Sequence, residues 1–491
     1  MFVITVKPGE KLISAPEGAN LLEVLREKGL APEAPCGGFG TCGKCKVLVD
    51  GKEVLACQTK VDRDMTVQLL KEKDKTNIMT AGLDVALTMN PLKPGYLLAF
   101  DIGTTTVVCF LLDGTTGKEL ASASMVNPQQ PYGADVISRI QAALENALDA
   151  QKDVIRDGMT SLITEVCEKA SISPADVGVI CVVANPAMQQ LFMGISPKNL
   201  SAVPFDPVIV KTDVVPAKEY LSICENADLL IIPDIAGYVG ADTMGCVIST
   251  KLYENDKLTL MVDIGTNGEM VLGNKDRMTA CSTAAGPALE GAKIKFGMRG
   301  APGAIDHVWV ENDKLVCSTI GGGEAKGICG SGLIDAIACA LDLKLINKRG
   351  RIKAEEEKDG DRFIELTDSV YITQNDIREV MLAKGAIAAG IELMAEQLQF
   401  QVADIEEVLL AGAFGSFMNP KSACRIGLLP MVLDGKIKPI GNAAGTGSKM
   451  MAADRDEFQK SGELKEKIEF IELANLDNFM HCFAKNMNFT E

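Results

Sequence analysis

Short stretches of alternating apolar and polar positions run through the first 72 residues, and such alternation is typical of half-buried strands. Five of these stretches are predicted strands: Phe2–Val6, Lys11–Ser14, Lys46–Val49, Glu53–Cys57 and Thr66–Leu69. After the second strand, Asn20 is placed to cap a helix over 21–28, whose leucines fall on one face. Asp50-Gly51 joins the third and fourth strands and is a strong hairpin signal. A hairpin, a helix and further strands in this order predict a small β-grasp fold.

The alternation stops after residue 70. Charged residues dominate the next positions, apolar spacing is weak after them, and Pro91 and Pro94 close the stretch. We interpret residues 73–95 as a linker with at most one short helix, which separates a first domain at 1–72 from the rest of the chain. A mobile tether would let a small domain reach two different partners.

From Tyr96 onward, apolar strands alternate with longer helical stretches, which is typical of α/β proteins. The elements predicted first are strands at 97–100, 107–112 and 177–183 and helices near 134–149 and 152–170. The opening of this part recurs, because Asp263 stands 162 residues after Asp101 and each follows an apolar strand. This internal duplication divides the chain into lobes at 96–256 and 257–491.

Composition limits the classes of function. The chain of 491 residues has a formal net charge of −17, which argues against nucleic acid as a partner because phosphate contacts need clustered Lys and Arg. No apolar run approaches the ~18 residues that span a bilayer, and the first residues do not resemble a signal peptide. The 15 cysteines favour a reducing compartment. We therefore expect a cytoplasmic protein that binds neither membranes nor nucleic acid.

Four cysteines carry the first chemical signal. Cys36, Cys42 and Cys45 lie in one glycine-rich loop, and Cys57 follows one hairpin later. Their spacing, C-x5-C-x2-C-x11-C, is close to the plant-type pattern for a [2Fe–2S] cluster, and glycines let the backbone approach a cluster closely. Four-cysteine zinc sites prefer two Cys-x2-Cys pairs, which this spacing lacks. We predict a [2Fe–2S] cluster on these four thiols, with zinc or plain thiols as the alternatives.

Two related turns carry the second signal. Asp101-Ile-Gly-Thr-Thr-Thr and Asp263-Ile-Gly-Thr-Asn-Gly-Glu each join two apolar strands. Such turns offer backbone N–H groups and hydroxyls to phosphate oxygens, and an Asp at the strand end can hold Mg²⁺ directly or through water. One copy is a weak signal, but two copies can clamp a triphosphate from opposite walls of a cleft. In a third segment, 408–416, an apolar strand enters a glycine-rich turn and a helix, which would let the backbone approach a ribose and a base.

Together these three segments resemble the phosphate-1, phosphate-2 and adenosine motifs of the actin, sugar-kinase and Hsp70 (ASKHA) superfamily. The resemblance covers residues 96–491 and implies two RNase H-like lobes with ATP and Mg²⁺ in the cleft between them. The carboxylates implied to serve catalysis through the metal and its water shell are Asp101, Asp242 and Asp263. The residues implied to contact the nucleotide are Gly103, Thr104, Thr105, Thr106, Gly265, Thr266, Asn267, Gly268, Glu269, Gly286, Glu290, Gly412, Ala413, Gly415 and Ser416.

A short-spaced [2Fe–2S] domain ahead of such an ATPase looks like the reductive activators of corrinoid enzymes. Four further stretches are similar to that family: Tyr132–Arg139, Asn185–Met188, Gly286–Glu290 and Gly327–Asp335. Larger members carry an additional domain between linker and ATPase, where this chain has only a short stretch. The resemblance implies an ATP-dependent activator that passes one electron from a low-potential donor, through the cluster, to an inactive Co(II) corrinoid. The implied partners are a corrinoid protein of a methyltransferase system and an upstream electron donor, and a homodimer is left open.

Three alternatives remain at this point. An activator of the 2-hydroxyacyl-CoA dehydratase type also joins this ATPase fold to iron–sulfur chemistry, but it carries its cluster on cysteines of the ATPase domain. A small-molecule kinase with a redox-sensing ferredoxin domain would need a base near the acceptor hydroxyl, for which Asp234 and Asp242 are candidates. A redox-gated binding module is the non-enzymatic alternative. Trp309 is expected in the core, and His307 and His481 are expected to be structural.

Overall fold

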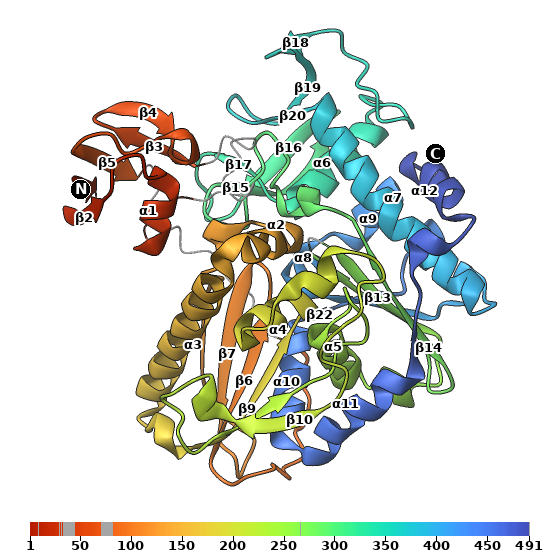
Figure 1. Ribbon diagram of the computed structural model, residues 1–491. Helices are drawn as coiled ribbons and strands as arrows, with labels where there is room; N and C mark the ends of the chain where they lie inside the picture. The colour runs from red at the N-terminus through yellow and green to blue at the C-terminus, as the bar shows by residue number, and fades with distance from the viewer. Residues whose placement is uncertain are drawn as a thin grey trace.

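The computed structural model describes residues 1–7, 9–28, 30, 32, 45–69, 82–265 and 267–490 (Figure 1). A small N-terminal domain lies beside a larger body made of two lobes, and each lobe is built around one mixed sheet of six strands. Within the described residues, no helix is both long enough and apolar enough to cross a membrane.

The small domain is a five-stranded sheet with one helix against it. Its strands are β1 (Phe2–Lys7), β2 (Lys11–Ala15), β3 (Lys46–Val49), β4 (Lys52–Leu55) and β5 (Met65–Leu69), in the order β2-β1-β5-β3-β4. The helix α1 (Leu21–Glu27) begins where predicted, because the Asn20 Oδ1 accepts hydrogen bonds from the N–H groups of Leu22 and Glu23. Its leucines pack into the core under the sheet, as a β-grasp fold requires.

One predicted strand of this domain ends early. β4 stops at Leu55, and Cys57 lies in a 3-10 turn over Ala56–Gln58, so the expected strand over Glu53–Cys57 is too long. The turn is stabilised by the Thr59 hydroxyl, which donates to the Leu55 carbonyl. The sharper backbone places Cys57 beside Cys45, which directly precedes β3.

The segment at 82–95 differs from the expected tether. It contains no helix, and the alternate side chains of Leu83, Val85, Leu87 and Met89 pack against the core that the two lobes share. The Asn90 N–H donates to the Ala453 carbonyl of the larger body at 2.8 Å. Residues 82–90 are therefore attached to the larger body, whereas the start of the predicted linker lies outside the described residues.

Lobe I holds the sheet β10-β11-β9-β6-β7-β8. Its strands are β6 (Tyr96–Ile102), β7 (Thr106–Leu112), β8 (Glu119–Val126), β9 (Val177–Ala184), β10 (Asp213–Pro216) and β11 (Asp228–Ile231). The helices are α2 (Val136–Ala142), α3 (Leu148–Ala170), α4 (Pro186–Met193) and α5 (Ala241–Thr250). The predicted helix boundary near 150 is wrong: the chain leaves helical geometry at Glu145 and Asn146, where Asn146 has a φ of 80°.

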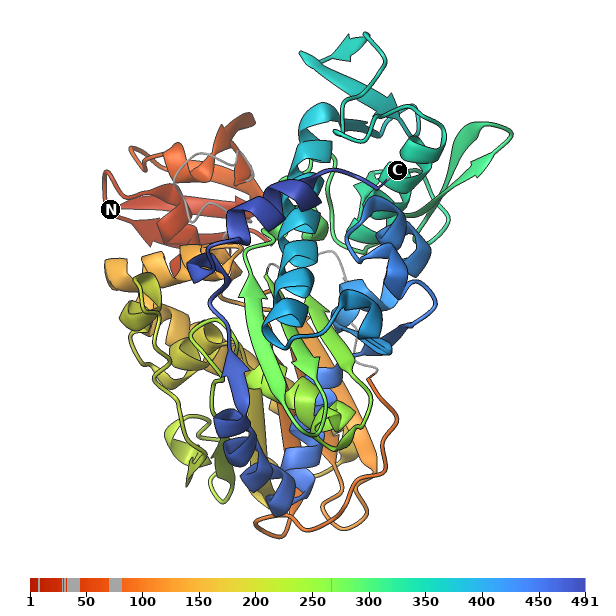
Figure 2. The ribbon, with the colours of Figure 1, turned by 90° about the vertical axis from the view of Figure 1, so that its right-hand side faces the viewer.

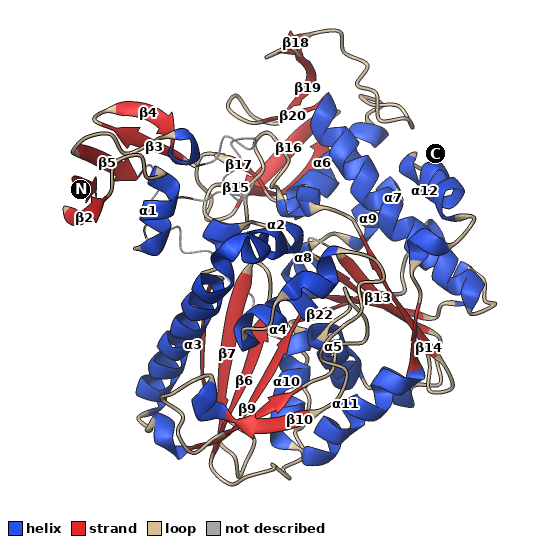
Figure 3. Cartoon of the chain, viewed as in Figure 1, coloured by secondary structure: helices blue, strands red, loops and turns tan. Residues whose placement is uncertain are grey.

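Lobe II holds the sheet β22-β21-β12-β13-β14-β23. Its strands are β12 (Thr259–Ile264), β13 (Gly268–Gly273), β14 (Met278–Thr283), β21 (Glu407–Ala411), β22 (Ile437–Gly441) and β23 (Ile468–Phe470). The helices are α6 (Gly330–Asp342), α7 (Gln374–Gln397), α8 (Gly412–Phe417), α9 (Pro420–Ile426), α10 (Ala443–Ala453), α11 (Arg455–Lys467) and α12 (Phe479–Met487). Figure 3 shows helices covering the sheets of both lobes.

Two small sheets extend from lobe II at the top of Figure 2. One contains β15 (Ala304–Glu311), β16 (Lys314–Thr319) and β17 (Gly327–Ile328), and the other contains β18 (Glu357–Lys358), β19 (Asp361–Glu365) and β20 (Tyr371–Thr373). Trp309 lies on β15 and is 43% exposed, so its expected place in the core is wrong. The strand projects from the body, and its outward positions face solvent.

Helices α5 and α10 lie between the two large sheets and form one core with strands of both lobes (Figure 1). Glycines set the closeness of this packing. A Cβ at Gly447 would lie 2.0 Å from the Gly245 carbonyl oxygen, and a Cβ at Gly245 would lie 2.8 Å from the Ala444 oxygen. Because only glycine allows such backbone contact, the sequence fixes how the two helices cross.

Candidate functional site

The two predicted phosphate turns each join two antiparallel strands, and the lobe I turn is one residue longer than the lobe II turn. In lobe I, Asp101 pairs with Val108 across the β6–β7 hairpin, and the Gly103 N–H donates to the Thr106 carbonyl at 2.9 Å. In lobe II, Asp263 pairs with Glu269 across the β12–β13 hairpin, and the Gly265 N–H donates to the Asn267 carbonyl at 2.9 Å. The structure thus contains a duplicated strand–turn–strand unit, with one copy on each sheet. Thr266 lies outside the described residues.

The predicted carboxylates come together between these turns. Asp101 is the next-to-last residue of β6, Asp263 is the next-to-last residue of β12, and Asp242 lies in the first turn of α5. Burial, followed by the charge of Asp242, raises the pKa of both Asp101 and Asp263 to about 7. Burial also raises the pKa of Asp242 to about 6. Three carboxylates at this spacing repel one another when they are ionised, and a bound cation would stabilise their charged form.

Glu290 lies between the two turns. The Thr105 hydroxyl of lobe I donates to the Glu290 carboxylate of lobe II at 3.3 Å. A Cβ at Gly265 would lie 3.6 Å from the other oxygen of the same carboxylate. The charge of Glu290 also contributes to the raised pKa of Asp263. Glu290 therefore faces the space in which a phosphate held by both turns would lie.

Several polar side chains that hold the lobe I turn were not predicted for this role. Arg139 is fully buried, and its guanidinium donates to the Thr104 carbonyl at 2.6 Å and to the Gly133 carbonyl at 2.9 Å. Asn185 donates to the Thr104 hydroxyl at 3.0 Å. Asn127 donates to the Gly103 carbonyl at 2.8 Å. These hydrogen bonds hold the turn within lobe I, while its Thr105 hydroxyl contacts lobe II.

Asn442 is a further residue that sequence reasoning missed. Its Nδ2 donates to the Asp101 carboxylate at 2.9 Å, and its Oδ1 accepts from the Gly445 N–H and caps α10. The cap itself is readable from Asn442 followed by a small-residue helical stretch. The contact with Asp101 is not readable, because it joins residues 341 positions apart.

The adenosine motif forms the predicted strand, turn and helix. β21 enters α8 at Gly412, whose φ of 80° favours glycine, and a Cβ there would lie 2.7 Å from the Asp263 carboxylate. Gly415 packs on Leu410, and the Ser416 hydroxyl donates to the Gly412 carbonyl at 2.9 Å. These contacts bring the start of α8 against the lobe II turn. The nucleotide contacts of this segment, including that of Ala413, stay a prediction.

The described half of the cysteine set fits a shared metal. The Sγ atoms of Cys45 and Cys57 lie 3.2 Å apart in a buried position. This distance is too long for a disulfide, which is about 2.05 Å, so the two side chains are adjacent but unlinked, which is compatible with binding to a common metal site. Cys36 and Cys42 lie outside the described residues. Elsewhere in the described ranges, no three His, Cys, Asp or Glu side chains are grouped closely enough to hold a metal ion directly.

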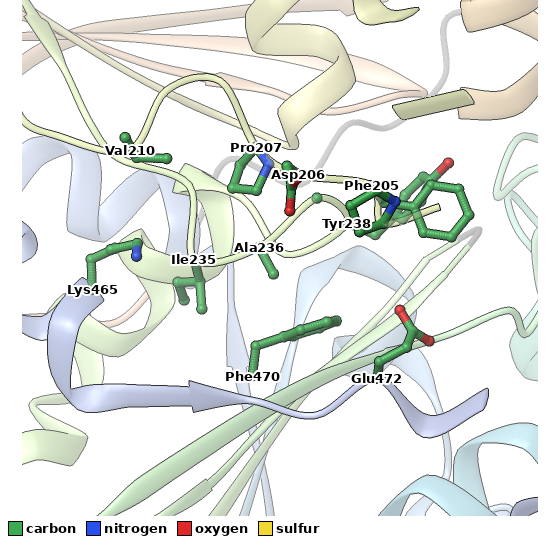
Figure 4. Close-up of a pocket in the computed structure, with 12 residues that line it drawn as sticks. Phe205, Asp206, Pro207, Val210, Ile235, Ala236, Tyr238, Lys465, Phe470 and Glu472 are labelled. Atoms are coloured by element: carbon green, nitrogen blue, oxygen red, sulfur yellow. The ribbon is translucent and has the colours of Figure 1, made fainter. Parts of the chain in front are cut away.

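Away from the phosphate turns, a cavity of about 410 Å³ opens between the lobes (Figure 4). Phe205 and Tyr238 of lobe I line it with rings 5.3 Å apart, and Phe470 and Glu472 face them from lobe II. None of the predicted site residues lines this cavity. The kinase alternative placed a base at Asp234, the residue before Ile235 of the cavity lining. Asp234 is fully buried, and burial raises its pKa well above the usual range.

Fold and site together define a two-lobed ATPase of the ASKHA type joined to a ferredoxin-like domain. Three family models match consecutive parts of the chain. They are a 2Fe-2S iron-sulfur cluster binding domain at residues 4–68, the RACo middle region at 96–255, and the C-terminal domain of RACo, the ASKHA domain, at 257–491.

Relatives match over nearly the full length. The corrinoid activation enzyme RamQ of Eubacterium limosum is 32% identical over 585 aligned positions that cover 98% of each chain. The [Co(II) methylated amine-specific corrinoid protein] reductase of Methanosarcina barkeri is 26% identical and covers 80% of this chain and 75% of its own. A solved reductive activator for corrinoid, iron-sulfur protein is 28% identical, with a TM-score of 0.71 and coverage of 100% and 98%. This chain belongs to the RACo family of reductive corrinoid activators.

Proposed function

We propose that this protein is an ATP-dependent reductive activator of a corrinoid protein. One electron passes from a low-potential donor, through the ferredoxin-like domain, to an inactive Co(II) corrinoid, which becomes Co(I). One observation carries the proposal: paired cluster cysteines and a duplicated set of phosphate turns occur in one chain, which aligns with a corrinoid activation enzyme from end to end.

ATP is needed because the electron transfer is uphill. For a one-electron step, 59 mV changes the equilibrium constant about tenfold, so a mismatch of ~120 mV leaves about one product in a hundred. A plant-type cluster near about −400 mV cannot bridge a much larger gap alone. ATP binding or hydrolysis can bridge it if two arrangements of the protein differ in affinity for the nucleotide and for the corrinoid partner.

The proposed roles of the cleft residues follow from their positions. Asp101, Asp242 and Asp263 would order Mg²⁺ and its waters, since Mg²⁺ keeps several waters and neutralises crowded carboxylates. The backbone N–H groups and hydroxyls of the turns at 103–106 and 265–268 would hold the phosphates. Glu290 would orient water at the terminal phosphate, because it already reaches the Thr105 hydroxyl across the cleft.

The ferredoxin-like domain would supply one-electron chemistry when its cluster is bound. Cys36, Cys42, Cys45 and Cys57 would hold the cluster, as the sequence spacing suggests. The donor is proposed to be a low-potential electron carrier, and the compartment a reducing cytoplasm in which none of the 15 cysteines is oxidised to a disulfide.

The test is an anaerobic mixture of reduced protein, MgATP and a Co(II) corrinoid protein, followed by the absorption band of Co(I). The band should grow only when all three components are present. Cys57→Ser should abolish it while nucleotide binding persists, and Asp263→Asn should abolish it while the cluster spectrum persists. Cys317→Ser removes a partly buried thiol outside the cluster and should behave like the wild type. No Co(I) band from a demonstrably reduced protein would refute the proposal.

A further inference from the structure

The ferredoxin-like domain contacts lobe I through a specific pair of residues. The guanidinium of Arg26 on α1 lies over the ring of Tyr132, 5.5 Å from its centroid. Both residues are nearly inaccessible to solvent, with Arg26 8% and Tyr132 7% exposed. In Figure 1, α1 is the element of the small domain beside α2, which follows Tyr132 in the chain. A desolvated cation over an aromatic face is a directional contact, so it specifies how the domain docks.

The same helix reaches the cluster cysteines at its other end. Asn20 caps α1 through its Oδ1, and its Nδ2 donates to the Cys57 carbonyl at 2.8 Å. α1 also packs along the turn at 56–58 that carries Cys57. One rigid helix of two turns therefore joins a predicted cluster ligand to the surface of the ATPase body.

On the ATPase side, Tyr132 is connected to the phosphate turn. The residue after it, Gly133, accepts a hydrogen bond from the Arg139 guanidinium at 2.9 Å. Arg139 donates in turn to the Thr104 carbonyl at 2.6 Å, inside the lobe I phosphate turn. A shift of the phosphate turn must therefore be carried by Arg139 to the loop that holds Tyr132.

A phosphate group between the turns would cause such a shift. In this structure the Thr105 hydroxyl is bonded to the Glu290 carboxylate across the cleft. A phosphate oxygen would compete for that hydroxyl and repel the carboxylate, so the Thr104–Thr105 segment would have to move relative to lobe II.

We infer that occupation of the phosphate turns weakens the Arg26–Tyr132 contact, so that nucleotide binding releases the ferredoxin-like domain from lobe I. The inference rests on the proposed function only in assigning phosphate to these turns. Coupling of this kind is reciprocal. A nucleotide that loosens the docked domain must itself bind more tightly when docking is removed.

The test compares Arg26→Gln with Arg63→Gln in the full-length protein carrying its cluster. Arg63 is the matched control, because it is on the same domain, is 59% exposed at its side chain and pairs only with Asp50 and Asp62 in the contacts described. Titration with the slowly hydrolysed analogue ATPγS and Mg²⁺ should show Kd lowered about 3- to 10-fold by Arg26→Gln and unchanged by Arg63→Gln. An unaltered cluster spectrum verifies folding of each variant.

Hydrogen exchange supplies a direct measure of docking. In the wild type, ATPγS should speed exchange of the α1 amides and of the loop at 130–135, and in Arg26→Gln these amides should already exchange fast without nucleotide. Tyr132→Phe keeps an aromatic face and should retain most of the effect. Equal Kd values for the two Arg variants, or weaker binding by Arg26→Gln, would overturn the inference. Failure of the wild type to bind ATPγS would instead count against the proposed function.

Discussion

The carboxylate cluster gives a quantitative prediction for Asp242→Asn. Asp242 is the neighbour whose charge acts on Asp101, Asp263 and Glu269, and the substitution keeps an oxygen that can accept from the Thr243 N–H. The folded pKa of Asp242, about 6, lies above its ordinary value of 3.8, so the folded state holds its proton to higher pH. Stability is therefore lost as pH rises from about 4 to about 6, and the full penalty is present at pH 8.

The size of the effect follows from the same numbers. The difference between a pKa of 3.8 and one of about 6 corresponds to about 3 kcal/mol at pH 8. Because Asp242 keeps some exposure to solvent, we take about half of this, or ~1.5 kcal/mol. Unfolding entropy of about 2.1 cal/mol/K per residue over a body of ~400 residues converts this to a rise in Tm of about 2 °C.

The assay is thermal unfolding of the wild type and Asp242→Asn at pH 8 and at pH 4.5, in the presence of a chelator. The variant should melt about 2 °C higher at pH 8, and most of the difference should disappear at pH 4.5. MgATP should raise the Tm of the wild type and leave that of the variant nearly unchanged, because the variant lacks part of the metal environment. A variant that is no more stable at pH 8, or equally stabilised at both pH values, would contradict the electrostatic reasoning.

Two further substitutions test the cleft and the core. Glu290→Gln should bind MgATP more tightly, because it removes a repelling charge, but should hydrolyse it at least tenfold more slowly, because it removes the group proposed to orient water. Nucleotide titration measures the first effect and phosphate release the second. Thr105→Val, which removes only the hydroxyl that bonds to Glu290, should slow hydrolysis less. Gly447→Ala should lower the Tm by several degrees, because the added Cβ would lie 2.0 Å from the Gly245 carbonyl oxygen. Gly462→Ala should leave the Tm unchanged, because the atom nearest to its added Cβ lies 3.3 Å away on a side chain. Equal melting temperatures for the two variants would show that α5 and α10 can separate at little cost.

Local patterns in the sequence predicted the elements of the fold well. The Asn20 cap, the Asp50-Gly51 hairpin and the two Asp-Ile-Gly-Thr turns each depend on a few neighbouring residues, and each forms as expected. Errors arose where tertiary contacts override local preference. Cys57 leaves the predicted strand for a tight turn against α1, and Trp309 lies on a projecting strand instead of in the core.

The candidate site was predictable as a set of residues but not as an arrangement. Asp101 and Asp263 could be paired because their turns repeat in the sequence. The supports of the lobe I turn, Asn127 and Arg139, reach it from other elements and carry no local signature of that role. The Asn442 contact with Asp101 spans nearly the whole ATPase and exists only because α10 returns between the sheets.

The position of α10 between the two sheets explains how a charge change at the carboxylate cluster can change the shape of the protein. The two helices shared by the lobes both begin at the carboxylate cluster, α5 with Asp242 in its first turn and α10 with its cap Asn442 on Asp101. One turn further on, the helices touch through the backbones of Gly245 and Gly447, so neither can tilt without the other. A cation that draws Asp101 and Asp242 together therefore acts on both helix starts at once. Both helices pack on β9 of lobe I, and α5 also packs on β13 of lobe II, so a shift of the helix starts is passed to the sheets of both lobes.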